Sequence, residues 1–401
     1  MTASALSGLR VLELSDGIAG AFCGKMFAGL GAEVIKIEPP EGDPLRFAGP
    51  FPGKVPNLDA SGSYLHFNTA KRSVTIDLAT TTGQLIFAQL AAEADLIIET
   101  CAPGYLDSID LSYERLAAEH PGMVMVSITP FGQNGPYRDY VANELVVYAA
   151  SGYMSLTGDP DREPHKAYGE QTAIHAGYQA ALAAIAAIVS RNASGSGQRI
   201  DVSQAEAASF LSGGGAPNAY LVRGEVARRS GTRLNGQQPH ASYPSTLRPC
   251  KDGWIHAHAN VRYPELMGEM MERPELNTPE ILATPAGHAD EIDAIMDGWL
   301  AQYDKWEVVR RAQAQRLHFT EVMTPAEVLE DGAYRERDFW FTYEHPDAGL
   351  IMQPGPLVRL TGTPWVDSPA PTLGEHNSEI LSGELGYSAD EVLLLADRRV
   401  I

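Results

Sequence analysis

The first two hundred residues alternate short apolar runs with stretches whose apolar residues recur at helical spacing. Six apolar runs have the length of buried strands, and they begin at Arg10, Ala32, Ser73, Asp95, Met123 and Arg199. The stretches between them carry helical periodicity, and the one from Thr80 opens with threonines suited to capping a helix. Strand–helix–strand repetition is typical of parallel sheets covered by helices. The sequence therefore predicts an α/β domain built on a parallel sheet.

The composition changes after Ser212, where Gly, Asn, Gln and Arg crowd a stretch that we interpret as a long surface connection. Two strands around a Lys-Asp-Gly turn follow, and a mostly helical region extends from Tyr263 to about Asp331. The chain ends in strand-like segments and a short helix, whose Ser388 and Glu391 form a capping box. A chain of 401 residues is long enough for two cores, so we expect a second, smaller domain.

The net charge of −21, from 30 basic and 51 acidic residues, argues against a nucleic-acid partner. It leaves room for a small phosphate-bearing ligand, which needs only a few local donors. Cys23, Cys101 and Cys250 lie far apart, so the sequence predicts neither a metal site nor a disulfide framework. No signal peptide is recognisable, and no uninterrupted apolar run approaches the ~20 residues that span a bilayer. We expect a cytoplasmic protein with no membrane role.

Three loops follow strands of the expected sheet. The turn at 15–20 joins a strand to a helix N-terminus, where free N–H groups favour an anion, although it is not a GxGxxG motif. It is either a weak ligand-binding turn or a plain tight turn. Lys71 and Arg72 precede a strand and either reach a phosphate or belong to a solvated loop. The loop at 131–140 follows the carboxyl end of a strand, where parallel sheets gather their ligand loops.

Glu144 precedes an otherwise apolar helix. It is either a charge that stabilises the helix N-terminus or a buried acid or base. The histidines show no Ser/His/Asp spacing and no metal-ligand spacing. His175 is of interest because it lies two residues beyond Ala173, in a Gly-containing turn that leads into a small-residue helix.

Several longer fragments resemble one known family, the family III (CaiB/BaiF-type) CoA-transferases. The fragments include LSGLRVLELS, GAEVIKIEPPEGDPLR, FNTAKRSVTIDL, VSITPFGQNGPYRD and LGEHNSEIL, and the resemblance extends along nearly the whole chain. It implies a Rossmann-like large domain from residues 1–211 and 340–401, a linker at 212–235, and a small α+β domain at 236–339 that includes the return linker. It also implies an interlocked dimer. The substrates would be an acyl-CoA and a small carboxylic acid, with no covalently bound cofactor.

The resemblance assigns residues to coenzyme A. Ile18 and Ala19 would line the thioester end, and Lys71 and Arg72 would lie near the nucleotide. The pantetheine path would pass Thr100, Cys101 and Gly104, and Glu144 matches an acidic position that touches the active centre.

The family nucleophile is an aspartate, which attacks the acyl-CoA carbonyl and forms a mixed anhydride. It stands four residues before a glycine that matches Gly177, and that position is Ala173 here. Glu170 is the nearest carboxylate that could replace it, and Glu144 is the next. Ser108 and Val141 stand where relatives carry basic residues, so two further polar anchors are missing.

Three activities remain open at this point. The first is a CoA-transferase that uses a substitute carboxylate, alone or within a heteromer. The second is a nucleophile-free subunit, paired with a paralogous active chain. The third is a CoA-thioester isomerase, racemase or lyase, with His175 or Glu144 as acid or base. Racemases of this family keep a His-Asp pair where this chain has Asn143 and Glu144, which argues against simple racemisation. The residues do not distinguish a homodimer from a heterodimer.

Overall fold

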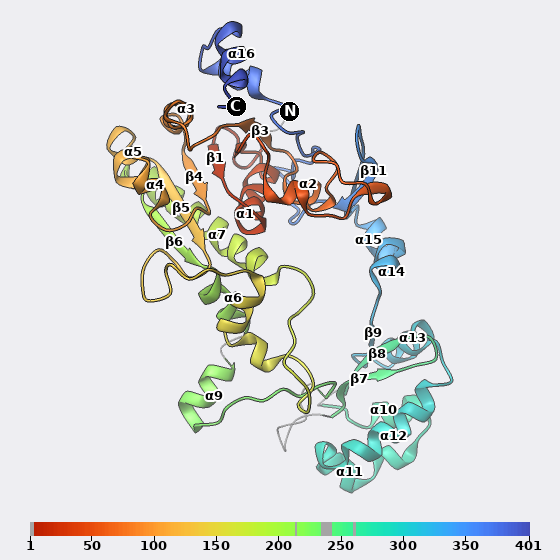
Figure 1. Ribbon diagram of the computed structural model, residues 1–401. Helices are drawn as coiled ribbons and strands as arrows, with labels where there is room; N and C mark the ends of the chain where they lie inside the picture. The colour runs from red at the N-terminus through yellow and green to blue at the C-terminus, as the bar shows by residue number, and fades with distance from the viewer. Residues whose placement is uncertain (1–3, 213–214, 234–242, 260–261) are drawn as a thin grey trace. The chain divides into compact units, whose positions relative to one another are not determined.

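The computed structural model describes residues 4–212, 215–233, 243–259 and 262–401. The chain divides into two compact units. The first contains Met1–Tyr153, Tyr168–Gly214 and Ala333–Ile401, and the second contains Met154–Ala167 and Gly215–Gly332. Figure 1 labels the elements of both.

The first unit is built on a six-stranded sheet in which every pair of neighbouring strands is parallel. The strands are β1 (Arg10–Leu14), β2 (Glu33–Glu38), β3 (Arg72–Thr75), β4 (Leu96–Glu99), β5 (Val124–Thr129) and β6 (Arg199–Ser203). Their order, β3-β2-β1-β4-β5-β6, is the doubly wound order of dinucleotide-binding folds. The predicted parallel α/β sheet is confirmed, and all six predicted strands are present.

The main helices of this unit follow the strands in alternation. They are α1 (Ile18–Gly29), α2 (Gly62–Phe67), α3 (Thr81–Ala91), α4 (Tyr105–Ser108), α5 (Tyr113–Glu119), α6 (Glu144–Ala150), α7 (Gln171–Ser194), α8 (Gln204–Ser209) and α16 (Ala389–Asp397). A hairpin of β10 (Trp340–His345) and β11 (Gly349–Pro354) and a π-helix at Glu379–Glu384 complete it. The predicted capping box of Ser388 and Glu391 is present at the start of α16.

Alternate residues of each strand face two separate cores, as expected for a sheet covered on both faces. In β1, Val11 packs in the layer formed with α1 and α7, whereas Leu12 packs in the layer formed with α3 and α16. Helix α7 is long and apolar enough to span a membrane by length and composition alone. Its alanine stripe is buried in the first core, so its apolar character is explained by packing.

Glycine lets α7 approach α1 closely. A Cβ on Gly177 would lie 2.7 Å from the carbonyl oxygen of Ala19, which is too close for any side chain. The beginning of α7 is therefore held directly against the first turns of α1.

The second unit contains a small antiparallel sheet of β7 (Ser245–Pro249), β8 (Trp254–His258) and β9 (Thr320–Glu321). Its helices are α9 (Gly215–Arg223), α10 (Leu266–Met271), α11 (Pro279–Ala283), α12 (Ala289–Leu300), α13 (Lys305–Ala314) and α14 (Pro325–Glu330), and α15 (Gly332–Glu336) begins at its last residue. The segment 154–167 belongs to this unit, although the sequence-based division assigned it to the large domain. The Arg229 guanidinium donates to the carbonyls of Asp159 and Arg162, which ties this segment to the chain after α9.

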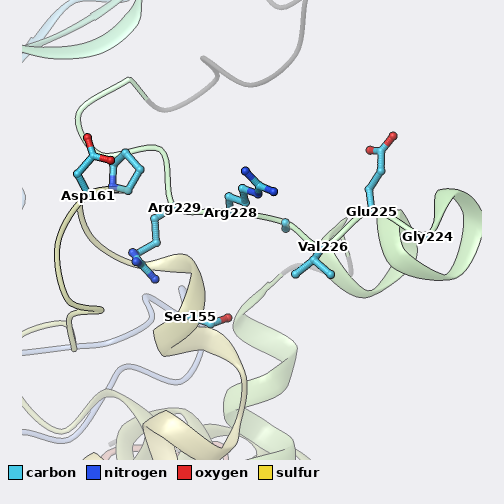
Figure 2. A pocket seen from close by; sticks show the side chains of 9 residues that line it. Ser155, Asp161, Gly224, Glu225, Val226, Arg228 and Arg229 are labelled. Atoms are coloured by element: carbon cyan, nitrogen blue, oxygen red, sulfur yellow. The ribbon is translucent and has the colours of Figure 1, made fainter.

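A cavity of about 1140 Å³ lies in the second unit (Figure 2). Its lining comes from two segments, Ser155–Asp161 and Gly224–Arg229. Arg228 and Arg229 are accompanied there by the carboxylates of Asp161 and Glu225, so the lining carries both signs of charge. None of the predicted site residues lines this cavity.

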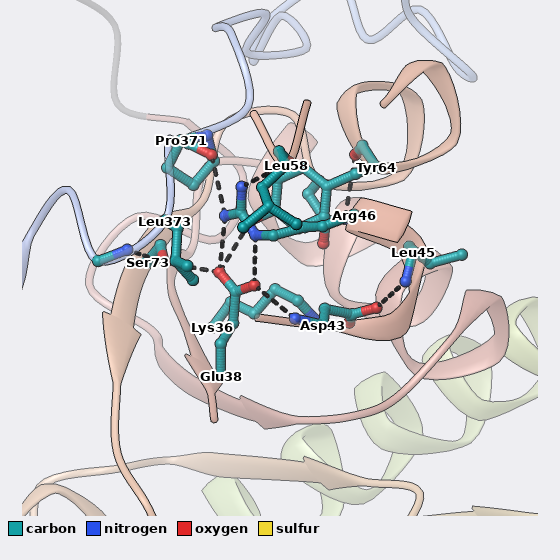
Figure 3. A network of polar contacts seen from close by, with 12 residues as sticks. Lys36, Glu38, Asp43, Leu45, Arg46, Leu58, Tyr64, Ser73, Pro371 and Leu373 are labelled. Atoms are coloured by element: carbon teal, nitrogen blue, oxygen red, sulfur yellow. Dashed lines mark hydrogen bonds and ion pairs between the residues drawn. The ribbon is translucent and has the colours of Figure 1, made fainter. Parts of the chain in front are cut away.

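Charged residues of the fragment GAEVIKIEPPEGDPLR form a buried polar network (Figure 3). The Arg46 guanidinium donates to both oxygens of Glu38, at 2.6 and 2.8 Å, and lies 3.6 Å from the centre of the Tyr64 ring. Burial raises the pKa of the Glu38 carboxyl, but the hydrogen bond and charge of Arg46, the Lys36 charge and the Ser73 hydrogen bond together outweigh burial and bring it to about 2. The Lys36 amine pairs with Asp43 at 2.7 Å. These charged residues are buried because they pair with one another. A sequence pattern alone would place them on the surface.

The fragment LGEHN attaches the chain's carboxyl-terminal part to β3. The backbone nitrogen of Gly374 donates to the Ser73 hydroxyl at 3.1 Å, and that of His376 donates to the Ser73 carbonyl at 3.0 Å. The Asn377 side chain accepts from Thr75 N at 2.8 Å. Both ends of the sequence therefore contribute to one unit.

Candidate active site

A pocket of about 320 Å³ opens at the carboxyl edge of the sheet, beside the ends of β1 and β4. The strand order reverses between β1 and β4, and such a switch point is where open α/β sheets bind ligands. The pocket is lined by Leu14, Asp16, Pro39, Ile76, Asp77, Leu78, Ala79, Thr100, Cys101, Ala102 and Tyr105. Two of the residues assigned to coenzyme A, Thr100 and Cys101, are among them.

The turn after β1 is fixed by its contact with the residue after β4. The backbone nitrogen of Asp16 donates to the Thr100 hydroxyl at 2.8 Å. A Cβ on Gly20 would lie 2.2 Å from the Ser15 Cβ and 2.9 Å from a Thr100 methyl, so this position requires glycine. Desolvation raises the pKa of the Asp16 carboxyl, and the neighbouring Asp43 carboxylate adds to the rise.

Ile18 and Ala19, assigned to the thioester end, form the first turn of α1. Ala19 is buried and Ile18 is half-buried, and both pack in or against the core that also contains Ala173. The structure thus brings these two residues and Ala173 into one apolar layer.

Cys101 is half-buried beside Glu99. Desolvation raises the pKa of the Cys101 thiol far above its ordinary value, and the Glu99 carboxylate adds to the rise. The thiol is therefore protonated at neutral pH and offers packing surface, not a nucleophile.

Lys71, assigned to the nucleotide, has its amine engaged inside the protein in this structure. Lys71 is 4% exposed, and its amine lies 2.7 Å from the Ala21 carbonyl, 2.8 Å from Asn68 Oδ1 and 2.6 Å from Glu13 Oε2. Burial lowers the pKa of Lys71 to about 8, with the Glu13 carboxylate opposing the drop. All three N–H donors have acceptors inside the protein, so the amine has none left for a phosphate.

Arg72 is also engaged within the protein. Its guanidinium forms ion pairs with Glu33, Glu379 and Glu384, the last at 2.7 Å. These carboxylates connect the edge of the sheet to the π-helix near the end of the chain. Arg72 therefore stabilises the fold in this structure and does not extend toward the pocket.

The turn at Gly104 lies beside a cation, Arg138, to which the sequence gave no role. Gly104 has φ +83°, and a Cβ built there would lie 2.8 Å from an Nη atom of Arg138. Arg138 belongs to the loop at 131–140, which the sequence placed among the ligand loops without giving this residue a role. Its side chain is 39% exposed, and its one ion pair with the described residues is a 3.7 Å contact with the adjacent Asp139.

A carboxylate from α6 occupies the beginning of α7. Glu144 accepts from the backbone nitrogens of Thr172 at 2.9 Å and Ala173 at 3.3 Å, and also from the Thr172 hydroxyl. The first N–H groups of a helix lack partners within the helix and attract negative charge, so Glu144 satisfies two of them. Glu144 thus approaches the position at which the family aspartate is expected, although it comes from a different helix. Thr172 was missed because its role depends on this contact across 28 residues.

The other candidates at this turn differ in exposure. Ala173 is 8% exposed, and its methyl group packs in the core formed by the sheet, α1 and α7. Glu170 is exposed at the N-cap position of α7, and its side chain does not cap the helix. His175 is half-buried in the second turn of α7. Glu144, Glu170 and His175 therefore belong to one local structure around the start of this helix.

Within the part of the chain that the structure describes, no group of three or more His, Cys, Asp and Glu side chains has a metal-binding arrangement. The functional groups of the candidate site are instead carboxylates and backbone N–H groups. A pocket at the sheet edge accompanies them.

Comparisons with known proteins identify relatives of this architecture. The sequence profile of CoA-transferase family III matches residues 6–377. Succinyl-CoA–D-citramalate CoA-transferase of Chloroflexus aurantiacus is 34% identical over 99% of this chain and 98% of its own length. Subunit BbsE of succinyl-CoA:(R)-benzylsuccinate CoA-transferase of Thauera aromatica is 32% identical over 96% of this chain and 95% of its own. The crystal structure of a CAIB/BAIF family protein from Brucella suis superposes with a TM-score of 0.84 at 28% identity, covering 96% of this chain and 100% of that one.

Proposed function

This chain belongs to CoA-transferase family III, and on that premise we propose that it transfers coenzyme A from succinyl-CoA to a small carboxylic acid. Both relatives named above carry succinyl-CoA in their names, which supports this donor. Both are transferases, which supports transfer over isomerisation or racemisation. The pocket at the switch point supports binding of the CoA portion at the carboxyl edge of the sheet.

The observation that carries the proposal is the carboxylate-bearing start of α7, where Glu144 is fixed by hydrogen bonds and Glu170 is exposed. In our proposal Glu170 replaces the missing aspartate. One of its oxygens attacks the thioester carbonyl, the C–O bond of a mixed anhydride forms, and the C–S bond breaks to release CoA thiolate. The thiolate then attacks the glutamyl carbonyl, which forms a glutamyl-CoA thioester and frees the donor acid. The acceptor carboxylate attacks this thioester, forms a second mixed anhydride and releases the thiolate. Attack of the thiolate on the acceptor carbonyl gives the new acyl-CoA and regenerates the Glu170 carboxylate.

Glu144 has a positioning role in this scheme. Its oxygens accept from two backbone nitrogens and a hydroxyl, which stabilises the carboxylate and lowers its nucleophilicity. It would instead keep the first turn of α7 in place beside the reacting thioester.

A second candidate is a nucleophile-free subunit that works with a paralogous chain. Two observations support it: Ala173 presents a buried methyl group at the expected nucleophile position, and Glu144 is fully engaged in hydrogen bonds. One of the relatives is itself named as a subunit of a transferase. In either case we propose a cytoplasmic dimer, interlocked as in the family, whose partner is a second copy or a paralogue.

Incubation of the purified chain with succinyl-CoA and a set of small carboxylic acids tests the proposal. Transfer by the chain alone, with hydroxylamine trapping an acyl group on Glu170, supports the first candidate. Transfer only after a paralogous chain is added, with the trapped acyl group on the added chain, supports the second. Exchange of the α-proton for deuterium without transfer would contradict both.

A further inference from the structure

The geometry points to a phosphate anchor that the sequence does not reveal: we propose that Arg138 binds a phosphate group of the CoA nucleotide at the rim of the sheet-edge pocket. This inference rests on the proposed function, because it takes acyl-CoA to be the ligand of that pocket. It concerns one residue of this chain and the chemical group that it recognises.

Arg138 lies beside the turn that borders the pocket. The ideal Cβ of Gly104 would be 2.8 Å from Arg138 Nη2, so the guanidinium lies directly on the backbone of this turn. Ala102 and Tyr105, on either side of Gly104, both line the pocket. Arg138 is therefore at the pocket's rim, and glycine at 104 gives it the space to be there.

Arg138 has spare hydrogen-bonding capacity. Its Nε atom is buried with no hydrogen-bond partner among the described residues. The guanidinium has five donors in a planar fork that matches a phosphate, and the 3.7 Å contact with Asp139 uses little of that capacity. Among the described residues, the one ion pair of Arg138 is therefore longer than a hydrogen bond.

The other cations expected near the nucleotide are engaged inside the protein. Lys71 donates to three acceptors in the core, and Arg72 is paired with three glutamates. Ser108 and Val141 occupy positions where basic residues were expected from the family resemblance. Arg138 thus supplies, from a different loop, a positive charge near the turn that Ser108 follows.

The pocket itself carries negative charge. Its lining includes the carboxylates of Asp16 and Asp77 and no basic side chain of the described residues. Such a lining suits neutral hydrogen-bond donors and repels phosphate. The phosphate groups of a bound nucleotide would therefore lie outside the pocket, on the side where Arg138 is located.

Calorimetric titration of the full-length chain with CoA, dephospho-CoA and pantetheine tests this assignment. We expect Arg138→Ala to weaken CoA binding about tenfold or more, as for loss of a charged hydrogen-bonding pair. Pantetheine, which has no phosphate, should bind both proteins equally. If the penalty disappears with dephospho-CoA, Arg138 contacts the 3′-phosphate; if it persists there, Arg138 contacts the diphosphate.

Two further variants make the result specific. Arg115→Ala removes an equal charge from an exposed residue paired with Asp110, and it should bind CoA as the unaltered chain does. Arg138→Lys keeps the charge but not the fork and should recover part of the affinity. Unchanged CoA affinity in Arg138→Ala, or an equal loss for pantetheine, would overturn the assignment and leave the proposed function standing. Failure of the unaltered chain to bind any of the three ligands would instead refute the proposed function.

Discussion

The carboxylate of Glu144 lies 2.9 Å from the backbone nitrogen of Thr172, so the first turn of α7 begins on a negative charge supplied by α6. This contact joins two helices that are separated by a long loop in the sequence. It also places a carboxylate beside Ala173, the position at which the family nucleophile is expected.

Replacement of Glu144 by alanine should destabilise the fold, because it leaves the amides at the start of α7 without their acceptor. The free energy of unfolding should fall by about 1–2 kcal/mol, the usual effect of losing a capping side chain. Urea denaturation measures this change. Glu119→Ala, which removes an exposed carboxylate from α5, is the matched control and should change the stability by less than about 0.5 kcal/mol. Equal stability of the two variants would show that the Glu144 contact is energetically unimportant.

Replacement of Glu170 by glutamine should remove the proposed nucleophile while leaving the fold unchanged, because the side chain is exposed and does not cap α7. We expect any intrinsic transfer to fall by several orders of magnitude, with CoA affinity retained. Hydroxylamine trapping followed by peptide mass spectrometry reads out the acyl-enzyme. Normal trapping in this variant would remove Glu170 from the mechanism.

Replacement of Ala173 by aspartate should restore the family carboxylate in a buried apolar setting. Burial would raise the pKa of the new carboxyl, so its ionised form, and with it acyl-enzyme formation, should increase as the pH rises. We expect a stability loss of about 1–3 kcal/mol from burying the polar group. Trapping experiments across a pH series test this, with Ala173→Asn as the control that cannot attack. Trapping that is independent of pH would contradict the expected burial effect.

The pKa of Glu38, about 2 against an ordinary 4.5, predicts a specific acid sensitivity. Because the pKa is lower in the folded state, Glu38 contributes stability above pH 4.5, and this contribution is lost as the pH falls toward 2. The contribution amounts to about 3 kcal/mol at most. In Glu38→Gln the free energy of unfolding should depend less steeply on pH across this window. If that variant does not fold, titration of the Glu38 carboxyl by carbon-13 NMR provides the test, and a midpoint near 4.5 would contradict the prediction.

Replacement of Gly177 by alanine should separate α7 from α1, because the added Cβ would lie 2.7 Å from the Ala19 carbonyl. We expect a loss of about 1–3 kcal/mol, as for other overpacked interiors, with reduced CoA binding at the displaced turn. Gly298→Ala is a matched control in α12, where nothing lies within 4 Å of the new Cβ. That control should stabilise the chain by up to about 1 kcal/mol. Similar melting temperatures for the two variants would show that α7 can shift freely.

The sequence by itself determined the elements whose signals are local. The six strands were readable because each is a short apolar run, and the capping box of Ser388 and Glu391 was readable because its partners lie three residues apart. The family resemblance further predicted a Rossmann-like fold, which the parallel sheet and its strand order confirm. The assignment of Ala173 to the position of the family nucleophile also depends on a local signal, and it remains a prediction.

Only the tertiary structure decided which charged groups are available. Lys71 and Arg72 suggested a phosphate site because their sequence neighbours do not reveal the glutamates that reach them from other strands and from the end of the chain. The contacts between Glu144 and Thr172 and between Arg138 and Gly104 join residues 28 and about 34 positions apart. Hydrogen bonds and ion pairs act over a few ångströms in space, whatever the separation along the chain, so the active-site environment is fixed only when the sheet and helices have assembled.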